Sequence, residues 1–365
     1  LDFCATDGNT VLVTPQNWLF LGTYEDMRRQ LFKKFSWNFV ARLGSKAFQT
    51  PMWDFGIALV SLLRSTPDPD HRIAGVDVGS NINSEDKSDG LHSLKIELVG
   101  QQNQLNNPDA ALNFVEMTNV SFLTKFAYCY QGTSTGDNPR FTCCFWELNS
   151  ISGDWECFQT PPSGVLPYGG KESVVNWRAL EAGFEGAAIR GGEAWRKLGI
   201  AFGQMADLPA TLFQGTKFSN SCPVLIPSNP DDLLPIWAFC ASGALAIALR
   251  QFNQKLSVDN GYITKVPFDL EHWQKVARDK YPDGLPKPLS SDSTQWLFNG
   301  HPAGADQPLH VAVARLVGYL WPRQTGSSFP DCAALDAGGL EALADEDGIV
   351  CLSPVRGEAS AVERL

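Results

Sequence analysis

The fold is decided by residues 11–63, which read VLVTPQNWLFLGTYEDMRRQLFKKFSWNFVARLGSKAFQTPMWDFGIALVSLL. The β-branched apolar run Val11–Val13 is closed by Thr-Pro and predicts a buried strand that ends in a loop. Two further strands are predicted at Trp37–Leu43 and Phe55–Leu63. The last is apolar almost throughout, so we expect it to be buried on both faces. This stretch therefore predicts the end of an α/β sheet.

A helix is predicted between the first two strands. Thr23 is a candidate N-cap, and Glu25 and Asp26 suit the first turn because carboxylates are favourable at a helix N-terminus. Apolar residues recur at helical spacing at Tyr24, Met27, Leu31 and Phe35. These side chains would form the buried face of the helix.

The rest of the chain divides by composition into two further parts. Residues 64–110 are rich in Asp, Pro, Asn and Ser, which predicts a domain junction with long loops. We therefore expect the end of an α/β domain in 1–66, an α+β domain in 67–266 and a helical extension in 267–365. The predicted elements beyond residue 110 are strands at Ala127–Tyr130, Phe141–Leu148, Gly199–Phe202, Ala210–Phe213, Val224–Ile226 and Ile349–Leu352, and helices at Leu233–Asn253, Leu270–Lys280 (capped by Asp269), Leu309–Leu320 and Leu340–Ala344.

Composition excludes several classes of protein. The longest apolar run, Ile236–Leu249, is shorter than the roughly 20 residues that a bilayer-spanning helix needs, and no signal peptide opens the chain. The nine cysteines form no CxxC pair, so we expect reduced thiols in a cytoplasmic protein and no metal. The histidines form no triad, and no Gly-x-Ser-x-Gly elbow occurs, which argues against a hydrolase. The net charge of −11 counts against a nucleic-acid partner unless one face is locally basic.

The order of motifs in the decisive stretch carries a family resemblance. A Pro-x-x-Trp-Leu turn at Pro15–Leu19 is followed by Arg-Arg-Gln-Leu at Arg28–Leu31 and by a Leu-Gly loop that reaches Phe at Leu43–Phe48. This series resembles the last third of the catalytic domain of Eco57I-type and TaqI-type DNA adenine-N6 methyltransferases. The resemblance implies that the three strands are numbers five, six and seven of a Rossmann-like methyltransferase sheet.

Later motifs extend the resemblance. GTSTGDNPRF at Gly132–Phe141 looks like the Thr-Gly-x-Asn motif that opens the target-recognition domain of these enzymes. PYGGKESVVNW at Pro167–Trp177 resembles a segment of the PglX methyltransferases of BREX phage defence, and Gly203–Pro209, Pro223–Gly243 and Val266–Gln274 follow the same group. The implied setting is restriction-modification or phage defence of the BREX or DISARM kind.

Two elements of the family are missing from this sequence. It has no glycine-rich turn after a strand to hold S-adenosylmethionine, and no Asn-Pro-Pro-Tyr tetrapeptide. In the family, both precede the strand that begins here at Val11. The chain also lacks an initiator Met, so we expect the carboxy-terminal part of a longer enzyme that binds S-adenosylmethionine, inactive when alone. Its expected partners are an N-terminal methyltransferase half, double-stranded DNA and other phage-defence proteins, with no membrane.

Phe48 and Trp18 are the candidate residues at the sheet. An adenine must leave the duplex before its exocyclic amine can react, and the resemblance implies that Phe48 stacks on that base. The structural alternative for Phe48 is a hydrophobe that anchors the loop under the sheet. Trp18 would follow the carboxyl end of a strand, where α/β sheets bind ligands. It is a candidate pocket wall, with core packing as the alternative.

The candidate DNA contacts combine polar turns with basic residues. Residues 187–217 hold four basic and two acidic residues, and Arg and Lys contact guanine and phosphate. A plain turn or a solvated face is the alternative in each case. The candidates are Thr135, Asn138, Arg140, Lys171, Arg190, Trp195, Arg196, Lys197, Lys217, Lys255 and Lys265.

The function predicted from the sequence is therefore site-specific DNA binding that presents an extruded adenine to a catalytic half. Two alternatives stay open. One is a stand-alone specificity subunit that reads DNA for a separate catalytic chain. The other is a non-enzymatic binding module, with glycans as its candidate ligands, suggested by 11 Trp, 32 Gly and the acidic charge.

Overall fold

The computed structural model describes residues 4–49, 55–116, 120–148, 151, 153–205, 207–251, 253, 255 and 257–287. The chain forms two compact units, Leu1–Phe126 with Ser242–Leu270, and Ala127–Ala241 with Glu271–Leu365. This division differs from the predicted boundaries at residues 66 and 266. The predicted helices Leu309–Leu320 and Leu340–Ala344, and the strand Ile349–Leu352, lie outside the described residues.

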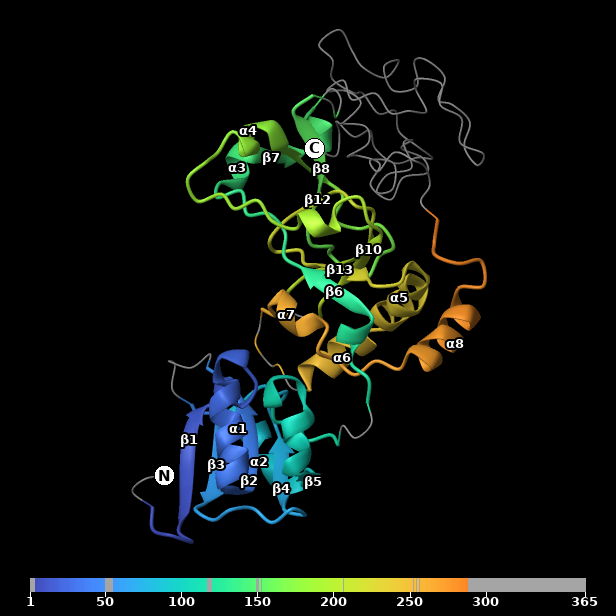
Figure 1. Ribbon diagram of the computed structural model, residues 1–365. Coiled ribbons are helices and arrows are strands. Elements are labelled where there is room, and N and C mark those ends of the chain that lie inside the picture. The colour runs from blue at the N-terminus through green and yellow to red at the C-terminus, as the bar shows by residue number, and fades with distance from the viewer. Residues whose placement is uncertain are drawn as a thin grey trace, which may run out of the picture. The chain divides into compact units, whose positions relative to one another are not determined.

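The first unit is built on a five-stranded sheet in the order β1-β3-β2-β4-β5 (Figure 1). Its strands are β1 (Asn9–Pro15), β2 (Ser36–Gly44), β3 (Ile57–Leu63), β4 (Arg72–Asp77) and β5 (Glu97–Gly100). β3 lies between β1 and β2 and is antiparallel to both, so β1 and β2 run in the same direction. β4 is parallel to β2. The prediction that the three strands of residues 11–63 share one sheet is confirmed.

Helices cover both faces of this sheet. On one face, Phe32 of α1 packs in a cluster with Val40 and Val60. On the opposite face, Leu91 of α2 packs with Ala41 and Leu59, whose side chains alternate with the first set along their strands. The helices of the unit are α1 (Glu25–Lys34), α2 (Ser84–Ser93), α6 (Ala244–Arg250) and α7 (Asn260–Ile263), with 3-10 turns η1 (Gln16–Leu19), η2 (Gly22–Tyr24), η3 (Gln102–Asn106), η4 (Pro108–Ala110) and η5 (Leu123–Lys125).

The predicted burial of the first strand is wrong. β1 forms, but Val11 is 68% exposed and Val13 is 61% exposed. The reason is position, because β1 is an edge strand that pairs only with β3 among the described residues. Leu12 on the other face is also exposed. An apolar run of this kind predicts a strand that can be buried. Whether the strand is buried depends on the strands and helices that pack against it.

The predicted helix face and the predicted junction also need correction. α1 begins at Glu25 after Tyr24, and no side chain caps it, so Thr23 is not the N-cap. Its buried residues are Arg28 and Phe32, whereas Tyr24 and Met27 are exposed. Residues 64–110 are not a loop-rich junction, because they supply β4, α2 and β5 to the first unit.

The second unit contains two four-stranded sheets, ordered β11-β10-β13-β6 and β12-β8-β9-β7. Every residue of β10, β11 and β13 is buried, as expected for short apolar runs inside a core. The strands are β6 (Ala127–Tyr130), β7 (Thr142–Cys144), β8 (Trp155–Gln159), β9 (Ser173–Asn176), β10 (Gly199–Phe202), β11 (Ala210–Phe213), β12 (Lys217–Phe218) and β13 (Val224–Pro227). The predicted strand Phe141–Leu148 is instead the end of a helical turn, a short strand and a 3-10 turn.

The long predicted helix Leu233–Asn253 is divided. Gly243 adopts φ +81°, a left-handed conformation that glycine tolerates, and it separates α5 from α6. Among the described helices, none alone is long and apolar enough to cross a membrane; only α5 with the turn before it, taken together with α6, reaches that length and composition. The helices of the second unit are α3 (Asn138–Phe141), α4 (Trp177–Glu181), α5 (Leu233–Ala241) and α8 (Leu270–Lys280), with 3-10 turns η6 (Phe145–Glu147), η7 (Gly192–Ala194) and η8 (Pro230–Asp232).

A buried guanidinium holds the first unit together beside the sheet. Arg28 of α1 is fully buried and donates hydrogen bonds to the backbone carbonyls of Trp18, Leu21, Asp109 and Ala110, at 2.5 to 3.1 Å. It therefore ties the turn after β1 and the η4 segment to α1. Burial lowers the pKa of Arg28 to about 10, so the group remains charged at neutral pH.

We predict that Arg28→Met lowers the free energy of unfolding by about 3–5 kcal/mol, because it leaves four carbonyls without their donor. Urea denaturation followed by circular dichroism measures the change. The matched control is Lys33→Met on the exposed side of the same helix, which should stay within about 0.5 kcal/mol of the parent. Equal losses for the two variants would contradict the structural role of Arg28.

Candidate nucleic-acid interface

The ends of three strands meet at one edge of the first unit's sheet. Pro15 and Gly44 both pair with Ile57, so β1 and β2 end at the same level. Arg42 pairs with Asp77 in the parallel ladder, so β4 ends there too. Ligands of α/β sheets bind outside the carboxyl ends of such strands. The turn that contains Trp18 and the loop that contains Phe48 both leave from this edge.

The Phe48 loop is anchored at its base and leaves the ring in solvent. Gly44 has φ +68°, and a Cβ there would lie 2.7 Å from the Cα of Gly79, so glycine is required at this close approach. Ala47 packs against the cluster of Leu43 and Val76. Phe48, the next residue, is 49% exposed. The hydrophobe that anchors the loop is therefore Ala47, and Phe48 is free to contact a ligand.

Trp18 both packs on the core and lines a hollow. The centroids of the Trp18 and Trp37 rings are 5.5 Å apart, and the angle between the ring planes is 51°. Together with Leu12 of β1 and Met27 of α1, Trp18 also lines an apolar hollow of about 510 Å³. The hollow opens beside the exposed edge strand β1. Trp18 thus has the position of a wall residue, in a hollow suited to apolar groups.

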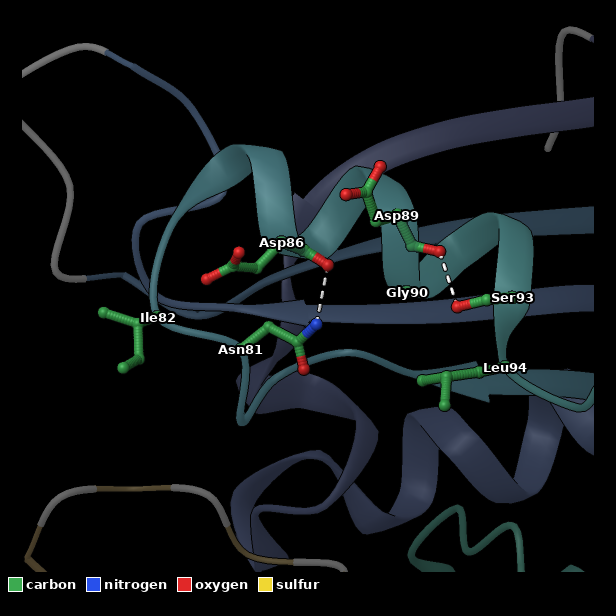
Figure 2. A pocket seen from close by; sticks show the side chains of 7 residues that line it. All are labelled: Asn81, Ile82, Asp86, Asp89, Gly90, Ser93 and Leu94. Carbon is green, nitrogen blue, oxygen red and sulfur yellow. Dashed lines mark hydrogen bonds between the residues drawn. The ribbon is translucent and has the colours of Figure 1, made fainter.

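A second hollow, of about 470 Å³, lies along α2 (Figure 2). Its wall carries the carboxylates of Asp86 and Asp89, and the Asn81 side chain donates to the backbone carbonyl of Asp86 at 2.6 Å. Two carboxylates and no lining cation make this hollow unsuited to phosphate. Among the described residues, no group of three or more His, Cys, Asp or Glu side chains is arranged to hold a metal ion.

The candidate DNA contacts of the second unit come together on two paired segments. Ser134 and Ala188 exchange backbone hydrogen bonds of 2.8 and 3.0 Å, and the Thr133 hydroxyl donates to the Arg190 carbonyl at 3.0 Å. Gly136 has φ +74°, and a Cβ there would come within 2.8 Å of the Gly186 backbone. Residues 131–140 and 184–197 therefore form one surface, which we call the paired-loop surface.

Exposed cations project from the paired-loop surface. The Arg140 guanidinium lies 4.9 Å from the Phe184 ring centroid, which supports it from below. Arg190 is exposed and donates to the Gln131 side chain at 3.0 Å. Arg196 and Lys197 are exposed as well. Four cations and three carboxylates in these segments leave only a small positive excess, so directed contacts matter more here than bulk charge.

Three of the predicted DNA contacts are turned inward, which corrects those predictions. Thr135 is 3% exposed, and its hydroxyl donates to the side-chain oxygen of the exposed Asn138. Lys171 is 6% exposed, so its ammonium group does not reach the surface. Lys217 is held between the indole rings of Trp177 and Trp195. Trp195 itself is half-buried against two hydrophobic clusters.

Lys255 and Lys265 belong to the first unit, whereas the paired-loop surface belongs to the second. Lys255 is exposed and forms an ion pair with Asp259 at 3.1 Å. Lys265 is half-buried and paired with Asp109 at 2.6 Å. The Lys265 ion pair fastens residues 242–270 to the η4 segment, so this lysine has a structural partner in place of a phosphate.

The residues that support these side chains were not predictable from the sequence. Phe184 under Arg140 and Gly186 beside Gly136 are far from their partners in the chain, and only the fold brings them together. The one available signal was the density of glycines around residues 183–192, which is typical of close backbone approach.

No protein-family model and no curated protein matches this chain. Among solved structures, it is similar to the Type IIL restriction-modification enzyme MmeI in complex with DNA, at 11% identity and a TM-score of 0.44, covering 89% of this chain and 48% of MmeI. It is also similar to a nuclease-deletion mutant of the Type ISP restriction-modification enzyme LlaGI in complex with a DNA substrate mimic, at 12% identity and a TM-score of 0.40. This match covers 78% of this chain and 30% of the LlaGI chain. A third is the type IIG restriction endonuclease BpuSI, at 8% identity and a TM-score of 0.29. This match covers 86% of this chain and 47% of BpuSI.

The solved structures similar to this chain are thus restriction-modification enzymes, and the chain spans less than half the length of each of these three. At these identities and TM-scores, the similarity carries no function over to this chain.

The buried lysine of the second unit generates a prediction about pH. Burial lowers the pKa of Lys171 from 10.5 to about 8. Below pH 8 the buried ammonium group destabilises the folded chain by its full desolvation cost. Between pH 8 and 10.5 the unfolded chain holds the proton more tightly than the folded chain, so this cost falls and stability rises with pH.

We predict that Lys171→Met is more stable than the parent at pH 7, by about 1–3 kcal/mol, and that the difference closes by pH 10.5. Denaturation of both proteins across this pH range measures it. Burial raises the pKa of Cys129 and other thiols, which acts in the opposite direction, but those groups are common to both proteins. A constant difference at all pH values would show that Lys171 is not desolvated.

Proposed function

We propose that this chain is the carboxy-terminal part of a site-specific DNA adenine-N6 methyltransferase of a restriction-modification or phage-defence system. Its role is to bind double-stranded DNA and to present an extruded adenine to a methyltransferase half. The observation that carries the proposal is the placement of Phe48, half-exposed on the loop after Gly44, which leaves the same carboxyl edge of the sheet as the Trp18 turn. The Eco57I-type resemblance places a base-stacking phenylalanine on such a loop.

The paired-loop surface supports the DNA-binding part of this proposal. Arg140, Arg190, Arg196 and Lys197 are exposed cations on segments joined by backbone hydrogen bonds. Because the backbone is fixed, these long side chains project from defined positions, which favours directed contacts to base edges and phosphates. Asn138 adds a neutral donor and acceptor on the same surface.

S-adenosylmethionine is the methyl donor that this function requires, but the residues of this chain do not fit it. The sequence has no glycine-rich turn after a strand and no Asn-Pro-Pro-Tyr element. We therefore assign no methyl-transfer step to this chain. Its own contribution is binding and orientation, which can supply a large share of the acceleration of a bimolecular reaction.

The edge strand β1 supports the proposed methyltransferase partner. Val11 and Val13 are exposed on one face, and Leu12 on the other adjoins the apolar hollow. A strand with apolar side chains on both faces is typical of the interior of a parallel sheet covered by helices. We therefore propose that the methyltransferase half adds a strand to β1 and covers both of its faces.

We predict that the chain binds duplex DNA with an affinity that falls log-linearly with salt concentration, because phosphate contacts release counterions. Arg140→Ala and Arg190→Ala should each reduce the salt slope by about one if they contact phosphate. Fluorescence anisotropy with a labelled duplex measures both quantities. The control is Arg178→Ala, which removes an exposed cation of the same unit paired with Asp154, and it should leave the slope unchanged.

Indifference to DNA at low salt would overturn the proposal and would favour the glycan-binding alternative. DNA binding by the chain when its methyltransferase partner is encoded separately would favour the specificity-subunit alternative.

Base stacking by Phe48 has its own test. In the chain paired with its methyltransferase half, Phe48→Ala should weaken binding of an extruded base by about 1–3 kcal/mol, because the stacking surface is lost. A duplex with 2-aminopurine at the target position reports extrusion as a rise in fluorescence. Leu98→Ala on β5 is the control, since Leu98 is a similarly exposed apolar residue of the same sheet, 53% against 49%. Unchanged fluorescence with Phe48→Ala would remove this residue from the base site.

A further inference from the structure

Lys217 occupies an aromatic cage inside the second unit. Its Nζ lies 4.0 Å from the ring centroid of Trp177 and 3.4 Å from that of Trp195. The two indoles meet edge to face, with centroids 5.3 Å apart and planes at 89°. The Lys217 side chain is 14% exposed, and Glu156 lies 4.0 Å from its Nζ. A cation enclosed in this way contacts indole faces in preference to water.

The backbone of Lys217 is anchored in the sheet. Lys217 and Phe218 form β12, which pairs in parallel with Phe158 and Gln159 of β8. The Phe218 carbonyl accepts a hydrogen bond of 2.8 Å from the Thr133 N–H, so the same dipeptide also holds the first of the paired loops. The side chain of Lys217 therefore extends from a backbone position that is fixed by these hydrogen bonds.

The cage wall formed by Trp195 is directly followed by two exposed cations. Arg196 has φ +62°, and its N–H donates to the carbonyl of Gly215 at 2.7 Å. Gly215 has φ +84°, and a Cβ there would lie 2.7 Å from the Cα of Arg196. The turn Trp195–Lys197 is thus held at two points. Gly215 accepts a hydrogen bond from its backbone, and Lys217 contacts the indole of Trp195.

We infer that Lys217 is a positioning residue for DNA recognition, which holds the Trp195 indole and thereby fixes the directions in which Arg196 and Lys197 project. The inference rests on the proposed DNA-binding function. Lys217 itself does not touch DNA in this role. Its charge acts at the indole faces, where a neutral side chain of equal length would fill the space without the electrostatic attraction.

This role differs from phosphate contact in what it does to salt dependence. A cation that contacts phosphate contributes about one unit to the slope of log affinity against log salt. A cation that only orients others contributes to affinity and leaves the number of phosphate contacts unchanged. Affinity and slope therefore separate the two roles.

The test compares Lys217→Met, Lys217→Arg and Arg196→Ala by DNA anisotropy across salt concentrations. We expect Lys217→Met to bind about three- to tenfold more weakly with the parent slope, Lys217→Arg to retain affinity, and Arg196→Ala to lose about one unit of slope. In a background that carries both Arg196→Ala and Lys197→Ala, Lys217→Met should cause no further loss, because the residues it orients are gone.

A second readout does not depend on DNA. The edge-to-face pair of Trp177 and Trp195 should give a near-ultraviolet circular dichroism signal that Lys217→Met alters and Lys217→Arg keeps. If Lys217→Met fails to fold cooperatively, Trp195→Leu replaces it, with the same expected loss of affinity and the same unchanged slope.

Three results would overturn the inference. A slope reduced by one in Lys217→Met would make Lys217 a direct phosphate contact. Parent affinity in a Lys217→Met variant with an altered dichroism signal would show that the cage does not serve recognition. A full further loss in the Arg196→Ala, Lys197→Ala background would show that Lys217 acts elsewhere. Absence of DNA binding by the parent protein would instead remove the proposed function, and this inference with it.

Discussion

The first unit depends on the guanidinium of Arg28, which with Arg42 is one of two fully buried arginine side chains there. Arg28 places a guanidinium where α1 and the segments before and after it converge, and four backbone carbonyls surround it. Removing this charge from water is costly, and the carbonyls offset that cost only while the Trp18 turn and the η4 segment keep their places. Asp109, whose carbonyl is one of the four, also pairs with Lys265 through its side chain. Through Asp109, Arg28 and Lys265 thus link the turn at the sheet edge to residues 242–270.

Much of the fold could be predicted from the sequence because short apolar runs define strands wherever turns isolate them. β10 and β11 match their predicted bounds, and β2 and β3 differ by one or two residues at their ends. The errors share a physical cause. Burial of β1 and of the Arg28 face depends on partners distant in the chain, and a local pattern of apolar residues contains no information about them. Gly243 similarly interrupts an apolar run that periodicity alone reads as one helix.

The candidate site was predictable in its residue types but not in their orientation. Motif order singled out Phe48, which is half-exposed on its loop, and its role in base stacking stays a prediction. Charge alone could not distinguish Arg190, which faces solvent, from Lys171, which is buried. A lysine stem is long and apolar enough to lie in a core, and its ammonium group then finds partners there. Lys217, which belongs to the basic window 187–217 but lies between two indole rings, shows that the positive charge of such a window is an upper limit on the basic surface it creates.

The open edge of β1 has a practical consequence for anyone handling this polypeptide in isolation. Among the described residues, one edge of β1 has no partner strand, and such an edge is a template for further β-pairing. β1 has exposed valines and carries neither a charged side chain nor a bulge that would discourage this pairing. Molecules of the isolated chain should therefore adhere to one another through this strand as their concentration rises. A lysine introduced at Val11 or Val13 would reduce that tendency.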